Sequence, residues 1–69
     1  MIDINSKIAQ FNMIWVETPT EKREELIKSL GFHTSFSICN SLEEMANRSG
    51  GWLAKRLLNL YIKGGFTND

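Results

Sequence analysis

The chain has 69 residues with eight basic and eight acidic side chains, so its net charge is zero; this length forms one domain with a small core. The neutral balance excludes the broad basic field that non-specific nucleic-acid binding requires. One cysteine, Cys39, excludes an internal disulfide, and one histidine, His33, leaves no ligand set for structural zinc. We therefore expect no metal and no cofactor.

The beginning of the chain, MIDINSKIAQF, has no positive leader followed by an apolar run, which is the pattern of a secretory signal. No apolar run approaches the roughly 20 residues that cross a membrane. These observations predict a cytoplasmic protein without a membrane contact. A domain this small is marginally stable unless something supplements its core. With disulfides and zinc excluded, we expect a two-fold homodimer.

The first predicted helix covers residues 6–17 and is capped by residue 5 or 6. A strand over residues 11–16 is the alternative, because FNMIWV is rich in residues with high β-propensity. In that form residues 10–15 resemble the DNA-reading strand of ribbon-helix-helix phage repressors, although an isoleucine breaks the alternation of polar side chains. The helix is favoured because it gathers four large apolar side chains within about 60° of arc: Ile4, Ile8, Phe11 and Trp15.

The second predicted helix covers residues 19–30. Thr18 stands before a proline, and Glu21 follows three residues later, which is the pattern of a capping box. Gly31 predicts a left-handed stop, after which Phe32 folds back on the last turn. The helix presents a narrow apolar stripe made of Leu26, Ile27 and Leu30.

The third predicted helix covers residues 36–49. Ser41 and Glu44 repeat the capping pattern, which favours a helix that begins near residue 41. Residues 32–38 alternate like a short strand, so the first turn is left open between residues 35 and 41. An early start is supported by five residues that share about 120° of a helix: Ile38, Cys39, Leu42, Met45 and Ala46.

The fourth predicted helix, over residues 52–63, is the most informative segment. Pairs of glycines bracket it, and residues 66–69 are expected to fray. Its apolar side chains span roughly 200°, about twice the width of an ordinary core-facing stripe. Such a helix is either central to the fold or half of a contact with another chain. We expect it to do both, with a dimer interface formed by Leu53, Leu57, Leu60 and Tyr61.

Together these elements predict an all-α protein, a single helical domain over residues 1–69. The short connections indicate a small three- to four-helix bundle, which we expect to be homodimeric.

Enzymatic chemistry is not supported by the residues present. His33 and Cys39 could form a thiolate–imidazole pair, but nothing supplies an orienting third group or an oxyanion site. The adjacent glutamates, at 24–25 and 43–44, point about 100° apart on a helix and suit a solvated surface. Neither glycine pair is followed by Lys-Ser or Lys-Thr, so neither forms a phosphate loop. We expect no catalytic activity and no small-molecule substrate.

The polar side of the fourth helix is the candidate binding surface. It combines a tryptophan with basic side chains, and Trp and Arg are enriched at the energetic centres of protein interfaces. We therefore predict a non-catalytic protein that dimerises and binds a heterologous protein stoichiometrically to regulate or inhibit it, of the type found among phage and mobile-element accessory proteins. The expected partner-binding residues are Trp52, Lys55, Arg56, Asn59 and Lys63.

A dimeric DNA-binding regulator is the alternative. Residues 42–63 (beginning LEEMANRSGGWLAKRLLNL) resemble a helix-turn-helix unit, with Ala46 at the helix crossing and Gly50 in the turn. Arg56 and Asn59 are residue types that read base edges. The residues after the turn depart from the usual pattern, in which an aliphatic residue and then a polar cap follow the glycine, because Gly51, Trp52 and Leu53 offer neither.

Overall fold

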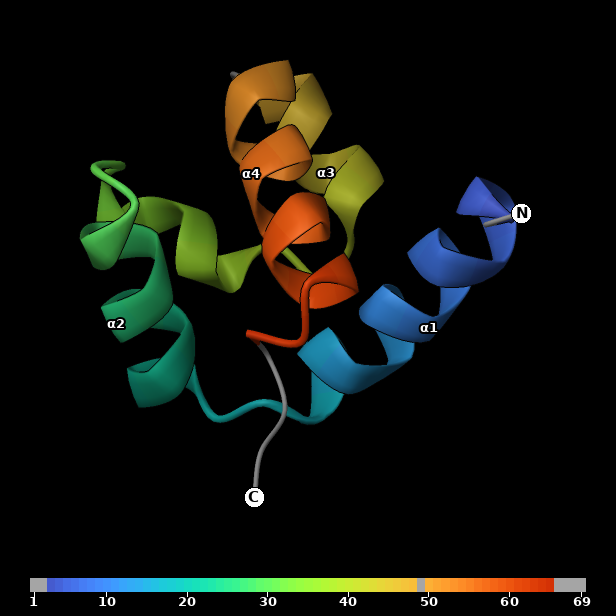
Figure 1. Ribbon diagram of the computed structural model, residues 1–69. Coiled ribbons are helices and arrows are strands. Elements are labelled where there is room, and N and C mark those ends of the chain that lie inside the picture. The colour runs from blue at the N-terminus through green and yellow to red at the C-terminus, as the bar shows by residue number, and fades with distance from the viewer. Residues whose placement is uncertain (1–2, 49, 66–69) are drawn as a thin grey trace.

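The computed structural model describes residues 3–48 and 50–65 (Figure 1), and over these residues the chain is helical without a strand. It contains four α-helices and one 3-10 helix: α1 (Ile4–Glu17), α2 (Thr20–Ser29), η1 (Thr34–Ile38), α3 (Leu42–Arg48) and α4 (Gly51–Ile62). The all-α prediction is confirmed. The expected fraying of residues 66–69 concerns positions outside the described ranges.

Helix α4 is central to the arrangement. It packs against α3, to which a short turn joins it, and against α1, while α2 packs against η1. Figure 1 shows α3 and α4 side by side, with α1 and α2 diverging below them from the linker that joins the two helices. None of the helices within the described ranges is both long enough and apolar enough to cross a membrane.

The N-terminal segment forms helix α1, so the helix prediction is confirmed and the strand over residues 11–16 is wrong. Residues 10–15 lie within it, so the ribbon-helix-helix resemblance is wrong. Its cap is Asp3 rather than residue 5 or 6, because the Asp3 carboxylate accepts the backbone N–H of Asn5 at 3.1 Å. The last turn is closed by Thr18, whose hydroxyl donates to the carbonyl of Ile14 at 2.8 Å.

That bond corrects the predicted start of α2. Thr18 serves the end of α1 instead of capping α2, whose N-cap position is Pro19 and has no side-chain cap. The predicted end of α2 is confirmed. Gly31 has a left-handed φ of 87°, and the N–H of Phe32 bonds the carbonyl of Ile27 at 3.0 Å. This six-to-one bond is the Schellman ending that the glycine predicts.

The predicted helix over 36–49 is divided into η1 and α3. Cys39 is extended (ψ 138°), which ends η1 and turns its carbonyl out of any helical ladder. Helix α3 then begins at Leu42, with the Ser41 hydroxyl accepting the N–H of Glu44 at 3.1 Å. The Glu44 carboxylate reaches back to the N–H of Asn40. The capping pattern therefore marks a real helix start, and the longer version is wrong.

A side chain of α1 supplies a second cap for α3. The Asn12 side-chain oxygen accepts the N–H of Leu42 at 3.0 Å, across 30 positions of sequence. We expect Asn12→Ala to lower the free energy of unfolding by about 1 kcal/mol, the usual effect of losing a cap. Urea unfolding followed by circular dichroism measures this change. Asn12→Asp keeps the acceptor and is the control; equal losses for the two variants would contradict the capping role.

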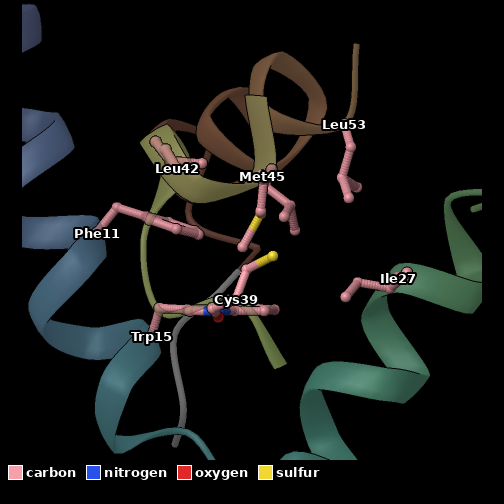
Figure 2. Close-up of a cluster of buried hydrophobic side chains, with 8 residues drawn as sticks. Phe11, Trp15, Ile27, Cys39, Leu42, Met45 and Leu53 are labelled. Atoms are coloured by element: carbon pink, nitrogen blue, oxygen red, sulfur yellow. The ribbon is translucent and has the colours of Figure 1, made fainter. Parts of the chain in front are cut away.

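The core lies where the helices meet. Phe11 and Trp15 stack with ring centroids 5.5 Å apart. Figure 2 shows them entering from α1, with Ile27 entering from α2 on the opposite side and Cys39 and Met45 between. The buried apolar set is Phe11, Trp15, Ile27, Cys39, Leu42, Met45, Leu53 and Leu57.

Candidate protein-binding surface

The predicted partner-binding residues share one exposed face of α4 and its C-cap, here called the α4 strip. On a helix these positions fall within about 100° of arc, because each lies three or four residues from another member of the set. The side chain of Trp52 is 70% exposed, as much as any large apolar side chain among the described residues. The strip consists of Trp52, Lys55, Arg56, Asn59 and Lys63, all exposed.

Trp52 and Lys55 interact within the strip. The Lys55 ammonium lies 5.8 Å from the centroid of the Trp52 ring, within the range of a cation–π contact. This contact orients the ring without burying it. The strip therefore presents a large aromatic surface next to positive charge, and displacing water from that surface would favour binding.

The opposite side of α4 anchors the strip to the core. Leu53 and Leu57 are fully buried there. Tyr61 donates its hydroxyl hydrogen to the Gln10 side chain of α1 at 3.0 Å, and its ring meets Phe11 edge-on at 6.0 Å. Beyond Lys63, Gly64 takes a left-handed φ of 88° and closes the helix. The strip is thus carried by a helix that the fold holds in place.

The anchoring involves two residues of the predicted dimer interface, while the oligomeric state itself stays a prediction. Leu53 and Leu57 have no exposed surface in the single chain, so they cannot also contact a second copy in this arrangement. Leu60 and Tyr61 are half-buried and pack against the same core. The wide apolar arc of α4 is explained by its central position between α3 and α1. None of these four residues is among the exposed large apolar side chains of the described ranges, which are Ile4, Met13, Val16, Ile38 and Trp52.

The helix-turn-helix resemblance is met at one of its two positions. Gly50 lies in the connection between α3 and α4, as expected, with an extended backbone (φ −175°). Ala46 is exposed, so it does not fill a tight crossing between the two helices as the resemblance expected.

His33 and Cys39 serve structural roles. The Nδ1 atom of His33 accepts the N–H of Ser35 at 3.1 Å and caps η1. The Cys39 thiol is buried, and this burial raises its pKa, with smaller effects from neighbouring charges. A raised pKa keeps the thiol protonated and weakens it as a nucleophile. No grouping of metal ligands occurs among the residues that the structure describes.

Arg23 is the most consequential residue that the sequence interpretation missed. Its side chain is only 7% exposed, and all of its hydrogen bonds go to backbone carbonyls. It donates to Trp15 at the end of α1 (2.9 and 3.1 Å) and to Ser37 of η1 (2.7 Å). A signal was available, because Arg23 precedes Leu26, Ile27 and Leu30 at the i+3, i+4 and i+7 spacings of one helical face.

Comparison with protein-family models, with curated proteins and with solved structures gave no match for this chain.

Proposed function

We propose that this chain is a non-catalytic, cytoplasmic protein that binds another protein stoichiometrically through the α4 strip and thereby regulates or inhibits it. The observation that carries the proposal is the 70% exposure of Trp52 among basic side chains. A tryptophan left in water is an unused source of binding energy, because its burial against a partner removes a large apolar area from solvent.

The position of the strip supports a protein partner. Its helix is fixed by the buried Leu53 and Leu57, so little backbone order has to be created on binding, and preorganisation of this kind increases affinity. The mixture of an aromatic ring with Arg56, Lys55 and the Asn59 amide matches the composition of an interface centre with a polar rim.

The test is affinity capture from a lysate of the source cell with the tagged chain. We expect a specific partner at a stoichiometric ratio and expect Trp52→Ala to lose it. The loss should correspond to about 2 kcal/mol or more, roughly 30-fold in affinity, as for a residue at the centre of an interface. The captured partner is then purified and the affinity is measured by titration calorimetry.

Met13→Ala is the matched control, because Met13 is also 70% exposed but lies on α1. It should retain the partner, and circular dichroism should show both variants folded. Equal retention by both variants would contradict the proposed surface. Capture of nucleic acid that weakens steeply with salt would instead support the DNA-binding alternative.

A further inference from the structure

We propose that the partner presents an acidic helical segment to the α4 strip, with carboxylates spaced by about one turn and an apolar side chain opposite Trp52. This inference rests on the proposed function and adds the chemistry of the partner.

Charge is strongly segregated in this neutral chain. Residues 45–65 contain four basic side chains and no acidic one. Three of these cations belong to the α4 strip. The fourth is Arg48, which is the last residue of α3 and is also exposed. A partner with negative charge would meet no carboxylate on this part of the chain.

The four cations form no ion pair with another residue in the described part of the chain. Among residues 3–48 and 50–65, no carboxylate forms an ion pair with Arg48, Lys55, Arg56 or Lys63. The exposed glutamates of α2 lie on a helix whose main contact is with η1. Glu43 and Glu44 lie in the first turn of α3, at the opposite end of that helix from Arg48. The positive charge of the strip is therefore available to a partner.

The spacing of the strip defines the partner further. Lys55, Asn59 and Lys63 form one row with a separation of four residues, which is about 6 Å per step along the axis of a helix. Carboxylates at the same separation on a neighbouring helix would pair with both lysines, while Asn59 donates a hydrogen bond between them. Trp52 lies in the first turn of α4, before this row. An apolar side chain of the partner would cover its exposed ring.

A nucleic acid fits these observations less well. The zero net charge provides no long-range attraction for a polyanion. Ala46 is exposed, so α3 and α4 lack the tight crossing at a small residue that the helix-turn-helix resemblance expected. An acidic protein segment needs only the local field of four cations.

The probe is a labelled synthetic helix of about 14 residues with glutamates at every fourth position and a leucine facing Trp52, long enough to cover the strip. Fluorescence anisotropy measures its binding to the full chain at low salt. We expect the double variant Lys55→Gln with Arg56→Gln to bind about tenfold more weakly. We expect the affinity to fall again when ionic strength is raised from about 0.05 to 0.5 M, because the ions screen exposed charges.

Lys22→Gln with Lys28→Gln on α2 is the matched control, since it makes the same change in charge away from the strip. It should leave the affinity unchanged. A peptide with glutamine in place of glutamate should not bind. The inference is overturned if the glutamate peptide does not bind, if the two peptides bind equally, or if a duplex DNA of similar charge binds more tightly than the glutamate peptide.

These results separate the inference from the proposed function. If the captured partner depends on Trp52 but is insensitive to the Lys55 and Arg56 substitutions, the binding surface is correct and the acidic partner is wrong. If the partner is retained by Trp52→Ala, the proposed surface itself is wrong.

Discussion

Replacing Arg23 with methionine is expected to lower the free energy of unfolding by about 3 kcal/mol or more, because several buried carbonyls lose their donor and each unsatisfied group costs about 1–3 kcal/mol. A chain of 69 residues is stabilised by only about 3–10 kcal/mol in total, taking roughly 0.05–0.15 kcal/mol per residue. The variant should therefore lose a large share of its stability. Circular dichroism during urea and thermal unfolding measures the effect.

The reason lies in the carbonyls that Arg23 satisfies. Its Nε and Nη2 atoms donate to Trp15 and Nη1 donates to Ser37, with longer contacts of 3.4 Å to Val16 and Cys39. Its guanidinium carbon also lies 5.2 Å from the Trp15 ring centroid. Methionine fills much of the same volume but has no donor. It would leave buried carbonyls of α1 and η1 without this partner, and unsatisfied buried groups are costly.

Two further variants make this prediction specific. Lysine keeps the charge, but its three donors lie on one nitrogen atom and cannot reach all the carbonyls that the three arginine nitrogens reach. Arg23→Lys should therefore lose some stability, but less than the methionine variant. Lys22→Met changes the exposed neighbouring residue on α2 and should stay within about 0.5 kcal/mol of the unsubstituted protein. An Arg23→Met variant that unfolds at the same urea concentration as Lys22→Met would refute the bridging role.

Local signals were sufficient to predict much of the fold. The left-handed ending at Gly31 and the capping pattern of Ser41 and Glu44 depend on residues only a few positions apart, and both are confirmed. The apolar spacing of α1 likewise predicted which of its faces carries Phe11 and Trp15. Each of these features is decided by contacts within one or two turns.

The errors occur where distant contacts decide between alternatives that are locally similar. Residues 36–49 satisfy helical periodicity, but the Trp15 indole N–H donates to the carbonyl of Cys39 at 2.7 Å. That bond requires Cys39 to be out of the helical ladder, so the helix is interrupted there. The error at Thr18 has a local cause instead, because the end of α1 and the beginning of α2 compete for one hydroxyl, and the hydroxyl bonds the carbonyl of Ile14 four residues earlier.

The candidate site was predictable as a set of residues, but its exposure was not. The spacing of Lys55, Arg56 and Asn59 places them on one polar face, whichever way the helix packs. Trp52 could have folded under the turn or pointed outward, and only the packing of α4 on α3 and α1 shows that it points outward. The same packing buries Leu57, which sequence periodicity alone could also have assigned to a second copy.

Leu57→Glu tests whether Leu57 packs in the core of its own chain or contacts a second copy. We expect the substitution to unfold the chain. Leu57 is fully buried, so the substitution loses the roughly 2–5 kcal/mol that a buried leucine contributes and also brings a carboxylate into an apolar core. The combined loss equals or exceeds the whole stability expected for a domain of this length. Circular dichroism should show an unfolded chain at 25 °C. Size-exclusion chromatography should show the larger hydrodynamic radius of an unfolded chain.

Ala46→Glu is the control, because Ala46 is exposed on α3 and its glutamate would remain in water. It should stay folded with nearly unchanged stability. Light scattering of the unsubstituted protein at micromolar concentration gives the oligomeric mass independently. A Leu57→Glu chain that stays folded while its mass falls from dimer to monomer would show that Leu57 contacts a second copy rather than the core. If the Leu57→Glu chain is unfolded while Ala46→Glu stays folded, the domain requires the buried face of α4. That face also fixes the orientation of α4, and with it the exposure of Trp52 on the opposite side.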